Sequence, residues 1–327
     1  MNFSSVYIEE EIAETERVTD ILERLGDIPK IRIERYGEIF NRAGQNFRLQ
    51  KQAPALILAK KHGKKVLPAP ESYGFEQGGG FYFSHMLNCL YDCRYCFLQG
   101  MYRSAHYILF TNYEDFMHDI LGQSAQAGGN VFYSGYDCDS LAMEPVSGFC
   151  DSFIPFFGSR SDMTLEIRTK STQVRKLLEF DPLPNCVVAM SFTPEAAAKR
   201  WEHRVPAITK RLQAMRKLQQ AGWPVAIRFE PVIAEPEVEN NYERLFQQVF
   251  STLDGELLHS VSLGEFRLPA GFHKKMVKLY PEEGLLARET ISSDGMVSLA
   301  GGGERMMLAL ESRLLTHVNG SRYYRCG

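Results

Sequence analysis

Six short apolar runs, separated by segments with helical periodicity, constrain the fold of this 327-residue chain more than any other feature. The runs cover residues 80–84, 130–135, 164–170, 186–192, 224–233 and 259–266. Strands that alternate with helices form a parallel sheet joined by right-handed crossovers. When such a sheet curls, it makes a partial (β/α)6 barrel of the TIM type, whose functional groups lie at the carboxyl ends of the strands.

A flat, doubly wound sheet is the alternative α/β architecture. It commonly carries a glycine-rich phosphate-binding loop, but GGG occurs here at 78–80 and 301–303 without a G-x-G-x-x-G pattern or a Walker lysine. We therefore predict the partial barrel for residues 79–266. Residues 1–78 read as an α/β N-terminal extension, with a helix from Ile8 to Leu25 and strands in KIRIERYGEIF and PALILAKKHGKK. Residues 267–327 read as a substrate-side segment with helices and a hairpin.

Composition narrows the class of protein. Seven cysteines, an odd number in a chain of this size, argue against a secreted disulfide framework. The first residues lack a signal-peptide pattern, and no stretch approaches the ~18 apolar residues of a membrane span. We expect a cytoplasmic, monomeric protein without a membrane partner. The net charge of -3 gives no global attraction to polyanions, so any contact with nucleic acid must come from local patches.

Three cysteines lie within eight positions of the segment NCLYDCRYC: Cys89, Cys93 and Cys96. A structural zinc site usually needs four ligands, and His85 is the nearest fourth candidate. A thioredoxin-type dithiol uses two cysteines and leaves Cys89 unexplained. An iron–sulfur cluster held by three thiolates leaves one iron open for a ligand. The loop follows the first barrel strand, where barrel chemistry is expected, and this favours the cluster.

The C-x3-C-x2-C spacing, with Tyr95 before the last cysteine, resembles the signature of the radical S-adenosylmethionine (AdoMet) superfamily. That resemblance implies a [4Fe-4S] cluster on the three cysteines and AdoMet chelated to the open iron. Reductive cleavage of AdoMet then gives a 5′-deoxyadenosyl radical, which removes hydrogen from the substrate. It also implies a one-electron donor such as flavodoxin or ferredoxin.

Further segments resemble the spore photoproduct lyase family, in the same order along residues 45–282. They include CRYCFLQG, EIRTKSTQVRKLLEF, VVAMSFTP and FRLPAGFHKKMVKLYPE. The resemblance implies repair of a thymine photoproduct in DNA. Two other functions stay open: a radical AdoMet enzyme acting on a peptide or small metabolite, and a zinc-stabilised nucleic-acid-binding protein.

Several site residues are carried over by position in these segments. The resemblance implies that Lys170 and Ser191 contact the cosubstrate, with Tyr95 and Phe97 beside them; Tyr95 is also a catalytic candidate. A lysine ammonium suits the AdoMet carboxylate, and this role is favoured over Lys170 merely solvating a strand end. The hydroxyl of Ser191 could instead satisfy local backbone groups. Arg228 and Glu230 share one face of a strand end, where they bind cosubstrate or substrate, or pair with each other.

The chain departs from the family pattern where hydrogen is returned to the substrate. Tyr136 stands at the position of the family's hydrogen-returning cysteine, and Cys138 follows two residues later. Phe97 replaces a tyrosine and has no hydroxyl. Cys138, Tyr136 and Cys326 are the candidates for the missing role. Cys138 could also be a buried filler, and Cys326 lies in a tail that is expected to be unconstrained. Cys150 and Cys186 have apolar surroundings in the sequence and are predicted to lie in the core.

The predicted substrate side is poor in aromatic residues. The hairpin SSDGMVSLAGGGERM contains Arg305 but no ring, so Met296 or Leu299 would have to act as a wedge between bases. The N-terminal part has a basic group of four lysines at 60, 61, 64 and 65. The basic run at 210–217 is typical of a solvated helix face. The set at 273–278 and the tail RYYRCG, with Tyr323 and Tyr324, are the better candidates for DNA contact.

Overall fold

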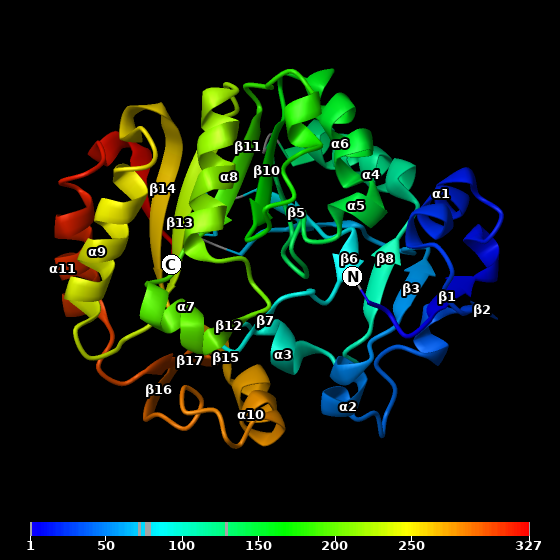
Figure 1. The fold of residues 1–327 in the computed structure, drawn as a ribbon, viewed down its shortest axis with the longest axis horizontal. Helices are drawn as coiled ribbons and strands as arrows, with labels where there is room; N and C mark the ends of the chain where they lie inside the picture. The colour runs from blue at the N-terminus through cyan, green and yellow to red at the C-terminus, as the bar shows by residue number, and fades with distance from the viewer. Residues whose placement is uncertain (1, 71–72, 76–79, 128–129, 327) are drawn as a thin grey trace.

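The computed structural model describes residues 2–70, 73–75, 80–127 and 130–326. Its main sheet is an open, curled half-barrel with the strand order β18-β14-β13-β11-β10-β9-β5-β4 (Figure 1). The six predicted runs form its parallel strands: β5 (Phe81–Phe83), β9 (Val131–Ser134), β10 (Thr164–Thr169), β11 (Cys186–Ser191), β13 (Val225–Val232) and β14 (Leu258–Glu265). The prediction of a partial TIM-type barrel is confirmed. The strand β4 (Val66–Pro68) adds to β5 in the antiparallel sense.

Helices between the strands cover the outside of the barrel. They are α4 (Tyr113–Ala127), α5 (Glu144–Ser147), α6 (Phe149–Gly158), α7 (Glu195–Trp201), α8 (Ile208–Gln220) and α9 (Val238–Phe250). The segment at 171–180, predicted as a helix, is instead a loop with one 3-10 turn at Leu177–Glu179. The hydroxyls of Thr169 and Ser171 accept hydrogen bonds from backbone N–H groups two residues ahead, which competes with helix formation.

A second sheet packs beside the barrel at the N-terminal side, on the right in Figure 1. Its strand order is β2-β1-β3-β8-β6. The bounds of its strands are β1 (Val6–Glu9), β2 (Lys30–Ile33), β3 (Leu56–Ala59), β6 (Met86–Leu87) and β8 (Tyr107–Phe110), with helices α1 (Glu16–Leu25) and α2 (Phe47–Gln52). Strands from both sides of residue 78 contribute to it. The predicted domain boundary itself falls in 76–79, outside the described residues.

The prediction of a helix beginning at Ile8 is wrong. Residues 6–9 form β1, and a 3-10 turn at Glu10–Ile12 follows before α1 begins at Glu16. Val6 and Ile8 are both buried and alternate along the strand, where Ile8 pairs with Leu58 of β3. Alternating burial against a neighbouring strand therefore overrides the helical spacing.

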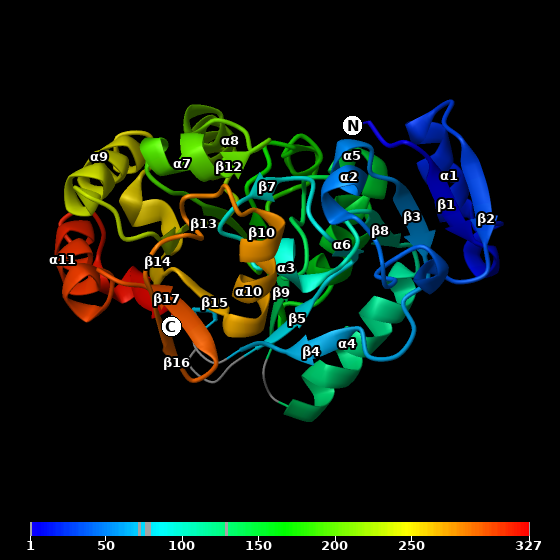
Figure 2. The ribbon, with the colours of Figure 1, turned by 90° about the horizontal axis from the view of Figure 1, so that it is seen from below.

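The C-terminal segment lies across the end of the barrel. It contains β15 (Arg267–Pro269), α10 (Ala270–Leu279), the predicted hairpin of β16 (Thr290–Ser293) and β17 (Met296–Leu299), and α11 (Glu304–Leu314). Figure 2 shows α10 beside α3 (Leu98–Met101), the short helix after the three cysteines. Gly100 permits this approach, because a Cβ there would lie 2.5 Å from the carbonyl oxygen of Phe272.

The tail is not the unconstrained terminus that the sequence suggested. Residues 323–326 form β18, which pairs in parallel with β14 and places Cys326 beside Gly264. Cys150 and Cys186 are fully buried, as predicted. Among the described helices, none combines the length and apolar character needed to span a lipid bilayer.

Candidate active site

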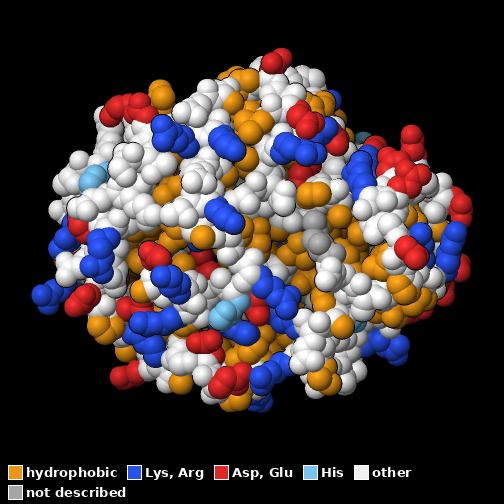
Figure 3. Space-filling view, in the orientation of Figure 1, with side chains coloured by type: hydrophobic (Ala, Val, Ile, Leu, Met, Phe, Trp, Pro, Cys, Tyr) orange, Lys and Arg blue, Asp and Glu red, His pale blue; other side chains and the backbone are white. Residues whose placement is uncertain are grey.

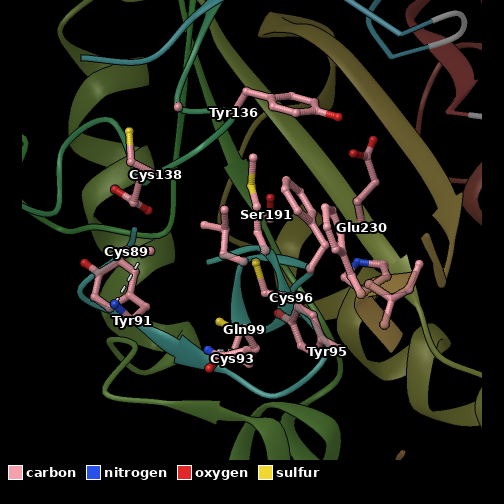
Figure 4. A pocket seen from close by; sticks show the side chains of 18 of the residues that line it. Cys89, Tyr91, Cys93, Tyr95, Cys96, Gln99, Tyr136, Cys138, Ser191 and Glu230 are labelled. Carbon is pink, nitrogen blue, oxygen red and sulfur yellow. Dashed lines mark hydrogen bonds between the residues drawn. The ribbon is translucent and has the colours of Figure 1, made fainter. Parts of the chain in front are cut away.

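A cavity of about 710 Å³ opens at the carboxyl ends of the barrel strands (Figure 4). Its wall combines all three cysteines of the loop with polar groups from the strand ends and apolar groups from the C-terminal segment. The lining includes Cys89, Cys93, Tyr95, Cys96, Phe97, Tyr136, Cys138, Asp139, Arg168, Lys170, Ser191, Glu230, Gly264, Phe272, Met296 and Cys326. The cavity therefore brings together residues more than 230 positions apart in the sequence.

The cysteine loop is anchored at several points. Its short strand β7 (Asp92–Cys93) pairs with β12 (Glu202–His203) in the antiparallel sense. Asn88 adopts a left-handed backbone with φ of 67°, and its side-chain amide donates to the carbonyls of Ser104 and His106 at 2.8 and 2.7 Å. These bonds fix the turn that precedes Cys89 and aim the loop into the cavity.

Burial raises the pKa of each of the three thiols. The pKa of Cys93 rises to about 12, while the nearby ammonium of Lys170 acts in the opposite direction. Thiols in such surroundings keep their protons unless a metal-containing group binds them, because a coordinating cation removes the proton outright. The loop is therefore suited to holding a metal centre.

The thiols of Cys89, Cys93 and Cys96 all line the same cavity. Within the described ranges, no three Cys, His, Asp or Glu side chains converge closely enough to hold one metal ion. His85, the fourth ligand that the zinc alternative required, is fully buried outside the cavity, 4.6 Å from the ring of Phe149. Burial lowers its pKa to about 3. The donor set in the cavity wall is thus three thiols without His85. Three thiolates are the set that a [4Fe-4S] cluster with one open iron requires.

Lys170 and Ser191 both line the cavity, at the ends of β10 and β11. The ammonium of Lys170 lies 5.6 Å from the ring centre of Tyr95. Asp139, which sequence reasoning missed, fixes the backbone here: its carboxylate accepts from the Lys170 N–H and the Thr169 hydroxyl, both at 2.6 Å. The only sequence signal for Asp139 was its place after a barrel strand.

Tyr95 contributes its ring to the cavity wall, but its hydroxyl points elsewhere. It donates to the buried carboxylate of Glu202, which also pairs with Arg211 at 2.6 Å. Arg211 was grouped with a solvated helix face; it is instead 1% exposed, because α8 turns this side chain inward toward Glu202. The catalytic and cosubstrate roles of Tyr95 stay predictions.

The alternative that Arg228 pairs with Glu230 is wrong. Arg228 is buried, pairs with Glu166 at 2.9 Å and lies outside the cavity wall. Glu230 lines the cavity, accepts from the Ser262 hydroxyl and lies 3.6 Å from Arg168. Arg168, also missed from the sequence, packs over the ring of Tyr73 at 3.8 Å. Arg228 and Glu230 therefore each pair with a residue of β10, and not with each other.

The hydrogen-return candidates occupy different walls. Tyr136 reaches across the cavity toward Glu230, and its ring lies 5.5 Å from Phe97 and 4.3 Å from Tyr82 (Figure 4). The sulfur of Cys138 points away from the three loop cysteines. Cys326 enters from β18, and its thiol lies 3.8 Å from the Tyr73 carbonyl oxygen.

The C-terminal segment, predicted to lie on the substrate side, agrees in part with the sequence-based predictions. Lys274, Lys275 and Lys278 are exposed on α10, whose Phe272 lines the cavity with Met296 of the hairpin. Leu299, the other proposed wedge, is buried and cannot act as one.

The other basic and aromatic candidates are largely engaged within the protein. Tyr323 donates to Glu311 and packs against the core, and Arg228 lies over the ring of Tyr324. Lys60 pairs with Glu11 and Lys65 with Asp119. On the face in Figure 3, Lys and Arg are scattered among Asp and Glu.

A half-barrel with three cysteines on the loop after its first strand defines a radical AdoMet-type fold. Residues 82–291 match the family model described as spore photoproduct lyase. The chain belongs to the spore photoproduct lyase family.

Named relatives agree with this assignment. Spore photoproduct lyase of Bacillus subtilis (strain 168) is 23% identical over 59% of this chain and 58% of its own length. The lyase of Geobacillus sp. (strain Y412MC61) is 24% identical over 51% of this chain and 50% of its own. The chain thus spans less than two thirds of these curated relatives.

Solved structures match over nearly the whole fold. A cysteine-to-serine mutant of spore photoproduct lyase superposes with a TM-score of 0.84 at 17% identity, covering 99% of this chain and 98% of its own. A double mutant with bound AdoMet and dinucleoside spore photoproduct superposes with a TM-score of 0.83, also at 17% identity and over the same shares.

Proposed function

We propose that this protein is a radical AdoMet enzyme that repairs a thymine photoproduct in DNA. The observation that carries the proposal is the meeting of Cys89, Cys93 and Cys96 with Lys170 and Glu230 around one cavity in a chain of this family. A solved relative holds AdoMet and the dinucleoside spore photoproduct, which supports the same ligands here. We further propose a cytoplasmic monomer reduced by flavodoxin or ferredoxin.

Different residues of the cavity wall bind the cluster, the cosubstrate and hydroxyl groups. The three thiolates would hold a [4Fe-4S] cluster and leave one iron open for AdoMet. Cluster and AdoMet would supply the radical chemistry that removes a hydrogen atom from the substrate. The ammonium of Lys170 pairs with the AdoMet carboxylate, and Asp139 holds the backbone of Lys170 in place. The carboxylate of Glu230 would accept hydrogen bonds from hydroxyl groups of a bound ligand, as it already does from the hydroxyl of Ser262.

The outer part of the cavity suits a nucleotide lesion. Phe97 and Phe272 lie nearly parallel with ring centres 6.3 Å apart, so they form an apolar wall beside the cysteine loop. The exposed lysines of α10 stand next to this wall and supply the charge for phosphate contact. Lesion enzymes take their target out of the base stack, and Met296 at the hairpin tip is in position to fill the gap.

The test uses the full chain, reconstituted with iron and sulfide without oxygen, then reduced with AdoMet present. A lesion-bearing oligonucleotide and the dinucleoside photoproduct are the substrates, and mass spectrometry measures restored thymine. We expect thymine and salt-sensitive binding of the oligonucleotide. Formation of 5′-deoxyadenosine with every pyrimidine lesion left intact would contradict repair and favour a peptide or small-metabolite substrate.

A further inference from the structure

We propose that Cys326, on the C-terminal strand, is the hydrogen-atom donor that completes the reaction in this chain. The inference rests on the proposed function and goes beyond it by assigning a catalytic residue. It starts from a gap in the site: Tyr136 and Phe97 stand where a thiol and a hydroxyl were expected.

The fold delivers Cys326 to the reactive end of the barrel. β18 runs parallel to β14, so its last residue lies at the same carboxyl edge as Glu230 and Ser191. The side chain forms part of the cavity wall that also carries Cys96 and Lys170. The pairing of β18 with β14 explains why a residue next to the terminus keeps a fixed place.

A glycine opposite Cys326 leaves room for its side chain. Gly264 pairs with Cys326 across the two strands and also lines the cavity. A Cβ at Gly264 would lie 3.1 Å from the Cys326 Cβ and 3.0 Å from the Glu230 Cγ. Any larger residue there would push the thiol and the carboxylate apart. The glycine therefore keeps Cys326 and Glu230 together in the wall.

The thiol is held in the form that can donate a hydrogen atom. Its S–H group donates a hydrogen bond to the Tyr73 carbonyl oxygen, 3.8 Å from the sulfur. A thiol is a weak donor, so this hydrogen bond is readily given up. Burial, followed by the negative charge of Glu230, raises the pKa of Cys326 to about 12. The S–H bond is thus intact at neutral pH.

Cys138 is less suited to the role, although it also borders the cavity. It belongs to a buried hydrophobic cluster that also contains Met86, Tyr107 and Leu109 of the N-terminal sheet. Its sulfur points away from the three loop cysteines in Figure 4 and receives a hydrogen bond from the Met86 backbone. These contacts are those of a core cysteine.

The chemical step balances without a further cofactor. The S–H bond of Cys326 breaks homolytically while a C–H bond forms on the carbon radical of the repaired base. This leaves a thiyl radical on Cys326. One electron from the same one-electron donor that the proposed function requires, and one proton from solvent, restore the thiol.

The first experiment compares wild type with the single variants C326S, C138S and Y136F, each reconstituted and assayed in deuterium oxide. Thiol and phenol protons exchange with solvent, so hydrogen return from either group labels the thymine. Serine keeps the size of cysteine, but its stronger O–H bond does not yield a hydrogen atom. We expect C326S to consume the lesion, lose labelled thymine and accumulate other products, whereas C138S and Y136F keep labelled thymine.

The outcomes separate the two proposals. Full labelled thymine from C326S, or its loss in C138S or Y136F alone, would overturn the role of Cys326 and leave repair intact. Failure of the wild type to consume any lesion would overturn repair, and the donor role with it. Near-ultraviolet circular dichroism and iron content of C326S must match wild type, since misfolding would lower both.

A second readout does not depend on turnover. Cluster-free wild-type protein is alkylated with N-ethylmaleimide, with and without the dinucleoside photoproduct, and each cysteine peptide is quantified by mass spectrometry. We expect the dinucleoside to slow labelling of Cys326, with Cys150 and Cys186, both fully buried, unlabelled in either case. Labelling of Cys326 at the same rate with the dinucleoside present counts against its place at the substrate.

Discussion

Replacing Cys93 with alanine is expected to leave this protein unable to hold the proposed iron–sulfur cluster and unable to cleave AdoMet. Wild type reconstituted in the absence of oxygen is expected to hold about four irons and four sulfides per chain. Cys93 is one of the three proposed cluster ligands, and alanine has no thiolate with which to bind iron. Iron and sulfide analysis, with the brown absorption of the cluster, measures the effect.

Two further variants show that the effect belongs to the loop. Cys186→Ala removes a cysteine that is fully buried outside the cavity, so it is expected to keep iron at the wild-type level. His85→Gln removes the residue on which a zinc site would depend. If wild type instead contains one zinc per chain and the His85 variant loses it, the result contradicts the cluster and supports the zinc site.

The sequence predicted those parts of the fold that depend on local pattern. The six barrel strands are apolar runs bounded by polar or glycine residues, and each appears where the pattern indicated. The cysteine loop was found because its three thiols are close in sequence and thiols have few structural uses in such a loop. Both signals need no knowledge of distant partners.

The rest of the site depends on partners that are far apart along the chain. Glu166 and Arg228 are 62 residues apart, and they pair because β10 and β13 flank β11 in the sheet. A two-residue period had suggested Glu230 as the partner of Arg228 instead. Cys326 looked unconstrained because nothing local predicts that the tail pairs with β14. Long-range register decided each of these cases.

The buried pair of Glu166 and Arg228 supports the largest expected loss of stability. Both side chains are within 1% of complete burial, and Glu166 also accepts from Arg168 at 2.7 Å. Glu166→Gln leaves the buried guanidinium of Arg228 without its counter-charge and removes one of the two carboxylates beside Arg168. We expect the free energy of unfolding to fall by about 3–5 kcal/mol, measured by denaturant titration of the cluster-free protein.

An exposed pair provides the matched control. Arg32 and Glu14 are 2.6 Å apart, but their side chains are 55% and 84% exposed. Water and salt screen such a pair, so Glu14→Gln is expected to change the free energy of unfolding by about 0–1 kcal/mol. A comparable loss in both variants would mean that burial does not set the strength of the Glu166 pair.

The pH dependence of unfolding tests the same pair through its charge. Burial by itself would raise the pKa of Glu166, but the charges of Arg228 and Arg168 outweigh it and lower the pKa from 4.5 to about 2. The unfolded chain therefore binds a proton at higher pH than the folded chain does. The stabilisation is complete above pH 4.5 and is lost as the pH falls toward 2. Wild type should lose stability across this window. Glu166→Gln should lose correspondingly less, because an amide does not titrate. Equal slopes for the two proteins would show that the pKa of Glu166 is the same in the folded and the unfolded chain.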